Sequence, residues 1–115
     1  MKVNKNSYCV YIVTNSLKTV LYIGVTNNLA QRITEHYMDR ISRKSFAGKY
    51  ACHYLVYYET YTSIAFAIER EKELKGWKRI KKELLILSFN PGWDFLNKEL
   101  LGEWPPTNLW HRGEK

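Results

Sequence analysis

The stretch from residue 8 to residue 37 most constrains the fold, because two strand patterns run directly into a helix pattern. Residues 8–14 (YCVYIVT) and 19–25 (TVLYIGV) are rich in β-branched and aromatic residues, and only a short turn separates them. Asn28 follows as a candidate N-cap, and Gln31 completes a capping-box pattern for a helix that reaches about Tyr37. The stretch therefore predicts an antiparallel hairpin that leads into an amphipathic helix.

The rest of the chain predicts one more strand and two more helices. Residues 38–49 have no clean period and indicate a basic loop, whereas residues 52–59 (CHYLVYYE) have a strand composition. Thr62 or Ser63 can cap a second helix that ends at Gly76. A third helix is predicted over about 77–88, with one apolar stripe that we expect to face the core: Trp77, Ile80, Leu84 and Leu87.

The predicted order β-β-α-β-α-α corresponds to an α+β fold, a small three-stranded, mostly antiparallel sheet flanked by helices. Residues 1–98 are expected to form a single domain, followed by a loosely packed or flexible tail over residues 99–115. No apolar run reaches the length of a membrane span, and the N-terminus lacks a signal-peptide pattern, so we expect a soluble cytoplasmic protein without a membrane partner.

Charge points to the class of partner. The chain has 18 Lys and Arg against 11 Asp and Glu, a net charge of +7, which favours a polyanion and usually nucleic acid. Cys9 and Cys52 lie in apolar stretches and are expected to be buried thiols. Two cysteines and three scattered histidines do not make a zinc pattern.

One carboxylate on the second predicted helix is out of place. On a helical wheel Ile64, Ala67, Ile68 and Leu74 form an apolar face, and Glu71 falls in the middle of it. A buried carboxylate is costly unless it is paired or bound to a metal. The residues alone leave two interpretations open, a structural ion pair and a metal-binding or catalytic carboxylate.

The first predicted helix and the hairpin place further polar groups in one neighbourhood. Arg32 and His36 are i and i+4 and share a helix face, directly after the strand that holds Tyr22 and Gly24 on one side. A tight hairpin makes Tyr11 a candidate cross-strand neighbour of Tyr22.

These motifs, in this order and spacing, resemble the GIY-YIG nuclease superfamily: CVYIV, YIGVT, NLAQRITEH, AIEREKELKGW and NPGW. The likeness covers residues 8 to 96 or so and is strongest to small single-domain bacterial members, which are related to the N-terminal nuclease domain of the bacterial repair excinuclease and to that of some homing endonucleases. The first motif departs from the family pattern, since Cys9-Val10-Tyr11 lacks its glycine, which is structural in the family.

The resemblance implies catalytic roles for six residues: Tyr11, Tyr22, Arg32, His36, Glu71 and Asn90. Arg32 would stabilise phosphate charge, and Glu71 would bind a single divalent cation, Mg²⁺ or Mn²⁺. Gly24 would be a structural residue that closes the second motif, and Asn90 would help to organise the site.

The implied function is a metal-dependent endonuclease that hydrolyses phosphodiester bonds in DNA, structure-directed or non-specific, in repair or recombination. An inactive nucleic-acid-binding module and a protein that needs a partner protein for activity are the alternatives. Basic residues of the loop and the third helix are expected to contact the DNA backbone: Arg40, Arg43, Lys44, Lys49, Lys78, Arg79, Lys81 and Lys82. The residues leave open which tyrosine is the general base and whether the substrate is DNA or RNA. They also leave open whether a DNA substrate is branched or damaged, and what the oligomeric state is.

Overall fold

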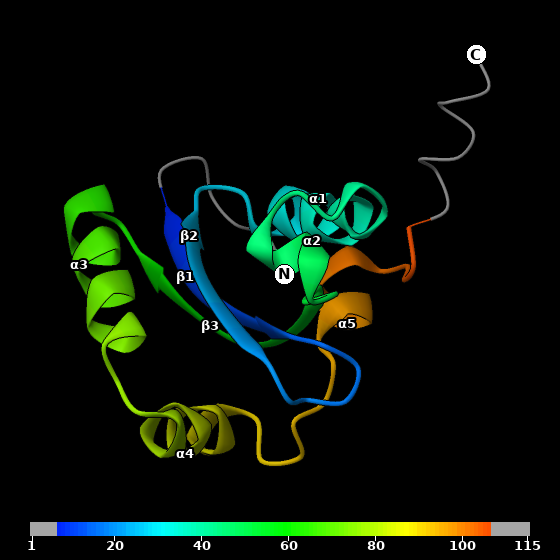
Figure 1. Cartoon of the computed structure of the whole chain (residues 1–115). Helices are drawn as coiled ribbons and strands as arrows, with labels where there is room; N and C mark the ends of the chain where they lie inside the picture. Colours follow the sequence, from blue (N-terminus) through cyan, green and yellow to red (C-terminus); the bar gives the residue numbers. More distant parts are fainter. Residues whose placement is uncertain (1–6, 107–115) are drawn as a thin grey trace.

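The computed structural model describes residues 7–106, which form an α+β fold around one three-stranded antiparallel sheet (Figure 1). Strand β1 (Tyr8–Thr14) lies in the middle, between β2 (Leu21–Thr26) and β3 (Tyr54–Tyr61). The predicted fold class and hairpin are confirmed. The third strand begins two residues later than residues 52–59 suggested, because Cys52 and His53 have no regular secondary structure.

Helices cover both faces of the sheet (Figure 1). Helices α1 (Leu29–Ser42), α2 (Phe46–Lys49) and α5 (Asn97–Leu101) lie on one face, and α3 (Ile64–Lys75) and α4 (Arg79–Phe89) lie on the other. Alternate residues of β1 therefore enter two different cores. Tyr11 belongs to the α1 side and Ile12 to the α3 side, and both are fully buried. Among residues 7–106, no helix combines the length and the apolar character needed to cross a bilayer.

Two helix starts follow from local capping chemistry. The Asn28 side chain accepts a hydrogen bond from the Gln31 backbone N–H (3.1 Å), and this confirms the predicted cap of α1. Ser63 rather than Thr62 caps α3, where its hydroxyl accepts from the Phe66 N–H at 3.4 Å. The cap of α1 matters for function, because it sets where the side chains of that helix point over the sheet.

The predicted basic loop over residues 38–49 is wrong. Helix α1 continues to Ser42, and a second, short helix α2 follows after Ser45, whose hydroxyl caps the Gly48 N–H at 3.0 Å. Gly48 lets α2 approach α1 closely, since a Cβ atom there would lie 2.5 Å from the Asp39 carbonyl oxygen. Sequence periodicity missed α2 because four residues are too short to show a period.

The orientation of α4 also differs from the prediction. Ile80 and Leu84 of the expected core stripe are 61% and 60% exposed, and the buried residue of the helix is Ile86. A heptad-like stripe shows that a helix is amphipathic, but it does not say which of two apolar sides meets the sheet. On α3, Ala67 and Leu74 are buried as predicted, whereas the outer positions are partly exposed: Ile64 and Ile68.

The packed part of the chain extends past the predicted boundary at residue 98. Asn97 of α5 is buried, and its amide accepts from the Leu55 N–H (2.8 Å) and donates to the His53 carbonyl (2.7 Å). Leu100 and Trp104 pack against the core on the same face. Residues 107–115 of the predicted tail lie outside the described residues.

Candidate active site

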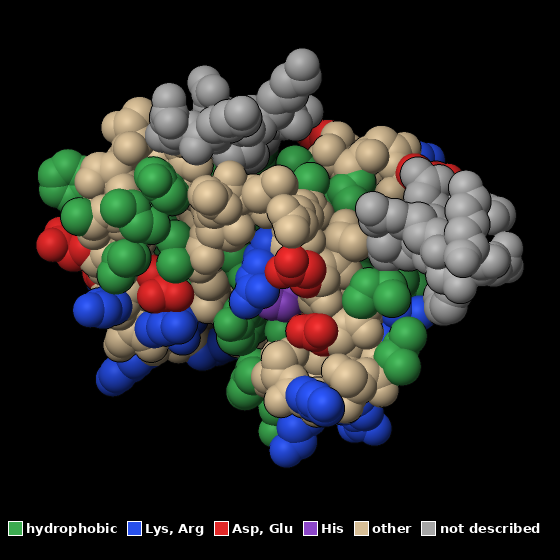
Figure 2. Space-filling model, turned by 90° about the horizontal axis from the view of Figure 1, so that it is seen from above, with side chains coloured by type: hydrophobic (Ala, Val, Ile, Leu, Met, Phe, Trp, Pro, Cys, Tyr) green, Lys and Arg blue, Asp and Glu red, His purple; other side chains and the backbone are tan. Residues whose placement is uncertain are grey.

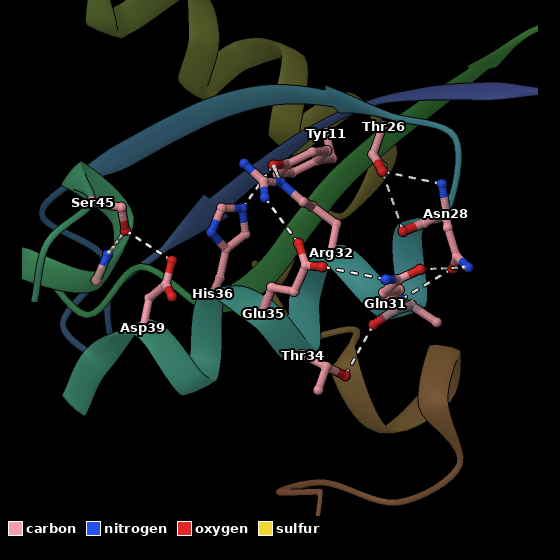
Figure 3. Close-up of polar contacts among 12 residues, drawn as sticks. Tyr11, Thr26, Asn28, Gln31, Arg32, Thr34, Glu35, His36, Asp39 and Ser45 are labelled. Carbon is pink, nitrogen blue, oxygen red and sulfur yellow. Dashed lines mark hydrogen bonds and ion pairs between the residues drawn. The ribbon is translucent and has the colours of Figure 1, made fainter. Parts of the chain in front are cut away.

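Tyr11 is the centre of a polar cluster buried between the sheet and α1. Arg32 and His36 both reach from α1 to its hydroxyl group (Figure 3). The Tyr11 hydroxyl lies 2.7 Å from His36 Nε2, and Arg32 Nε donates to the hydroxyl oxygen at 3.4 Å. The predicted convergence of a phenol, a guanidinium and an imidazole therefore occurs, and the i, i+4 spacing on one helix produces it.

Gly24 makes room for the Tyr11 ring. The two residues are paired across β1 and β2, whereas Tyr22 is paired with Val13. Tyr11 and Tyr22 are therefore diagonal neighbours, two residues away from the directly opposed pair that the sequence suggested. A Cβ atom at Gly24 would lie 2.9 Å from Tyr11 Cε2 and nearer still to the hydroxyl group. The glycine of the second motif is thus needed for the ring to cross the neighbouring strand.

His36 is neutral in this cluster. The side chain is only 2% exposed. Burial, with the positive charge of Arg32 as a second cause, lowers the pKa of His36 to about 4. Because Arg32 already donates to the Tyr11 oxygen, the fewest groups stay unpaired if the hydroxyl donates to Nε2. The other ring nitrogen of His36, Nδ1, is buried and has no protein partner among the described residues.

Arg32 connects the buried cluster to the surface. Its Nη1 pairs with Glu35 Oε1 at 2.9 Å, and the two side chains are 40% and 46% exposed. Figure 2 shows a basic and two acidic side chains around a histidine on the face seen from above. The guanidinium borders a surface cavity of about 440 Å³ whose walls also include Tyr8, Thr26 and Gln31. An anionic ligand therefore has open access to Arg32.

Tyr22 and Tyr11 differ in accessibility. Tyr11 is fully buried, whereas Tyr22 is partly exposed. The Tyr22 ring meets the His36 ring edge-on, with centroids 5.4 Å apart, and stacks on Phe46 of α2 at 5.8 Å. The sequence did not identify Phe46 as a neighbour of the site, because its placement depends on the unpredicted helix α2.

Glu71 points inward, as the helical wheel predicted, with 16% of its side chain exposed. Its ion-pair partner is Lys75, one turn along α3, at 3.3 Å, and Lys75 is itself 51% exposed. Burial raises the pKa of Tyr11 well above its ordinary value, Arg32 opposes that rise, and the charge of Glu71 adds to it. Glu71 thus lies within electrostatic reach of the Tyr11 cluster, and its ion pair is open to water.

The residues fit a weakly held hard cation better than a structural metal. Among residues 7–106, no group of three or more His, Cys, Asp and Glu side chains is placed to bind a metal. A single inward carboxylate suits Mg²⁺, which keeps several waters and takes further oxygen ligands from a phosphate. The Glu71 carboxylate is the group that could hold such an ion, with its other ligands supplied by water and substrate.

Asn90 lies outside the cluster. Its amide donates to the Val56 (3.1 Å) and Asp94 (2.8 Å) carbonyls and accepts from the Asp94 N–H at 3.0 Å. The side chain is 6% exposed and fastens the turn after α4 to β3. The role that this geometry supports is therefore structural, and no contact joins Asn90 to Tyr11 or Arg32 within the described part of the chain.

The predicted DNA-contacting residues divide between the two faces of the sheet. Arg40, Arg43, Lys44 and Lys49 lie on α1, α2 and the turn between them, whereas Lys78, Arg79, Lys81 and Lys82 lie on or next to α4. On the α4 side, Arg79 pairs with Glu83 and donates to the carbonyls of Thr19 and Lys18. Arg79 therefore fastens the hairpin turn, and only the first group shares a face with Arg32.

Comparison with known proteins places this arrangement in a family. A search among curated proteins found no match. The chain is similar to a UPF0213 protein from Bacillus halodurans solved by solution NMR, with 25% identity, 80% of this chain and 95% of that chain covered, and a TM-score of 0.49. The family model of the GIY-YIG catalytic domain matches residues 7–83. The chain therefore belongs to the GIY-YIG catalytic domain family, a family of nucleases.

Proposed function

We propose that this protein is a divalent-metal-dependent endonuclease that hydrolyses phosphodiester bonds in DNA without strong sequence preference, in repair or recombination. The observation that carries the proposal is the joint contact of Arg32 and His36 with the Tyr11 hydroxyl. The cluster is charged, open on one side and under-paired, which is typical of a site completed by its substrate.

Arg32 is the residue that we propose for phosphate binding. Its guanidinium offers a planar fork of donors that matches phosphate oxygens, and it keeps its charge at every relevant pH. Tyr11 accepts a hydrogen bond from Nε and Glu35 accepts one from Nη1, while the Arg32 side chain borders the surface cavity. Its exposed partner Glu35 is held by a surface ion pair with Arg32 and by a 3.3 Å hydrogen bond from Gln31, so a phosphate could displace it from Arg32 at little cost.

The two tyrosines take different roles in this proposal. Tyr11 is fully buried and hydrogen-bonded, so it positions Arg32 and His36 rather than meeting the attacking water. Tyr22 is partly exposed next to His36 and is the phenol that can reach a water molecule at the surface of the site. We therefore assign Tyr22 the proton-accepting role.

The proposed metal ligand is Glu71. A bound Mg²⁺ or Mn²⁺ would supply positive charge for the phosphate oxygens and for the leaving group. Glu71 itself needs only to exchange a water-exposed lysine for the cation, which supports a readily reversible site.

A nicking assay tests the proposal. Supercoiled plasmid is incubated with the wild-type protein in Mg²⁺, in Mn²⁺ and in EDTA, with the Glu71→Gln variant as the inactive control. We expect nicked circles only with a metal ion and only with Glu71 present. A protein that binds the plasmid but leaves it intact in both metals would instead be an inactive nucleic-acid-binding module. If a partner protein then restored cleavage, the chain would be a partner-dependent nuclease.

A further inference from the structure

Helix α2 extends a row of aromatic rings outward from the proposed active site, in which the planes of Phe46 and Tyr50 are tilted by 48°. Phe46 stacks on Tyr22 with ring centroids 5.8 Å apart and planes at 26°, and Tyr50 follows Phe46 at 4.7 Å. Phe46 is 50% exposed and Tyr50 is 42% exposed. These three residues, Tyr22, Phe46 and Tyr50, form a ladder that starts beside His36 and ends in solvent.

The ladder is held in place rather than loosely attached. Ser45 caps α2 and also donates its hydroxyl to Asp39 of α1 at 3.1 Å (Figure 3). Ala47 and Gly48 are buried against α1, with Gly48 in contact with the Asp39 backbone. A preorganised pair of exposed rings loses little entropy when it binds a flat ligand.

The surroundings of the ladder are positively charged. Arg43, Lys44 and Lys49 are all exposed, and Lys49 Nζ lies 5.5 Å from the Tyr50 ring centroid. No acidic residue occurs in the sequence between Arg40 and Tyr58, and the Asp39 carboxylate beside α2 is hydrogen-bonded to Ser45. Exposed rings that alternate with cations are the combination by which proteins bind single-stranded nucleic acid, with bases on the rings and phosphates on the cations.

We propose that the ladder binds unpaired bases of the strand that is cut, so that the substrate class is nucleic acid with a single-stranded segment. Inside a duplex, neighbouring base pairs cover both faces of every base, whereas an unpaired base offers a face to Phe46 or Tyr50. Because the ladder begins at Tyr22, whose ring contacts His36, a base on Phe46 would lie on the His36 side of the proposed active site. This inference rests on the proposed nuclease function only for that last step.

Binding without cleavage tests the proposal. Fluorescence anisotropy in EDTA compares a labelled oligo(dT), the same backbone with abasic sites, a blunt duplex and oligo(rU). We expect the loss of bases to weaken binding of the wild-type protein about tenfold or more. Base-dependent binding of either oligo(dT) or oligo(rU) supports the proposal. The strand that binds more tightly shows whether DNA or RNA is the preferred ligand. Equal affinity for the normal and abasic strands, or a preference for the duplex, would overturn it.

Variants locate the stacking. Phe46→Ala should weaken oligo(dT) binding about tenfold and abolish the difference between normal and abasic strands, whereas Phe46→Trp should preserve both. Phe66→Ala is the matched control, because Phe66 is a 65% exposed phenylalanine of α3. Lys49→Ala should weaken all strands equally and reduce the salt dependence by about one counterion. A Phe46→Ala protein that still distinguishes the two strands would refute the ladder as the base-binding surface.

The two proposals can fail separately. Base-dependent binding without any nicking would leave the ladder in place and reject the endonuclease. A protein that nicks plasmid but binds normal and abasic strands equally would support the endonuclease and reject the ladder as a base-binding surface. If Phe46→Ala does not fold, as judged by circular dichroism, Tyr50→Ala and the wild-type comparison of normal and abasic strands still decide the question.

Discussion

The protein has two clusters of tyrosine and arginine, one on each face of the sheet, and they are completed in different ways. On the α3 side, Glu59 is the centre: Tyr57 and Tyr61 donate to its carboxylate, and Arg70 adds Nε (3.0 Å) and Nη2 (2.9 Å). Arg70 also lies over the Trp77 ring at 5.1 Å. Every oxygen of this carboxylate is paired within the protein.

On the α1 side, no carboxylate is hydrogen-bonded to the central Tyr11 hydroxyl among the residues that the structure describes. Tyr11 takes the place of Glu59 at the centre, Arg32 finds its carboxylate only at the surface, and His36 Nδ1 has no protein partner there. The same residue types therefore make a closed ion network on one face and an open cationic site on the other. A closed network stabilises the fold, whereas an open one retains binding capacity for an anion.

The largest expected effect is on catalysis at Glu71. Glu71→Gln should reduce nicking about a thousandfold, about 4 kcal/mol of transition-state stabilisation, because a neutral amide is a poor ligand for a hard cation. The midpoint of chemical denaturation should change little, since the ion-pair partner of Glu71 is a half-exposed lysine. Nicking rates at saturating Mn²⁺ measure the loss, and a variant that still nicks at the wild-type rate would remove Glu71 from the site.

Arg32→Lys should reduce nicking about a hundredfold, because a point charge does not replace a fork that contacts both Tyr11 and a phosphate. The matched change on the closed cluster, Arg70→Lys, should leave the rate per folded molecule unchanged. Single-turnover nicking by both variants checks the prediction. Equal losses in the two variants would show that the effect comes from the fold rather than from phosphate binding.

Glu59→Gln should lower the free energy of unfolding by about 3 kcal/mol, because Arg70 would keep a largely buried charge without its main partner. Urea denaturation measures this loss, and Glu35→Gln is the control on the open cluster, where an exposed pair should contribute less than about 1 kcal/mol. If the two variants were equally destabilised, the contrast between a closed and an open cluster would not hold.

The next effect is gradual, because it is spread over a pH range. Burial is the main cause that lowers the pKa values of His36 and His53 to about 4. The unfolded chain, in which their pKa values are ordinary, therefore binds more protons below pH about 6.5. Stability should fall as the pH drops from about 6.5 toward 4, by at most about 1.4 kcal/mol per pH unit for each histidine.

The closed cluster should respond in a lower pH window. Its hydrogen bonds from Arg70, Tyr57 and Tyr61 lower the pKa of Glu59 against the opposing effect of burial. The contribution of Glu59 is therefore complete above the ordinary glutamate pKa and is lost only as the pH falls through the lowered value. Urea denaturation of His36→Gln and Glu59→Gln from about pH 2 to pH 7 separates the two contributions, and a His36→Gln protein with the wild-type slope above pH 5 would contradict the first.

Short-range interactions account for the parts that could be predicted. The limits of β1, the caps at Asn28 and Ser63 and the inward side of Glu71 all depend on residues within one or two turns of each other. The meeting of Arg32 and His36 likewise needs only the helical period. These features follow from the order of residues, because alternation, capping and periodicity act along the chain.

Contacts between distant segments account for the rest. Three contacts join residues that the local sequence pattern cannot relate. These are the pairing of Tyr11 with Gly24, the docking of α2 on α1, and the hydrogen bond from the Asn90 amide to the Val56 carbonyl. The outward stripe of α4 is the same case, since both sides of that helix are apolar and only the sheet selects one. Sequence pattern thus specifies which groups a helix or strand presents, whereas long-range packing selects the groups that they meet.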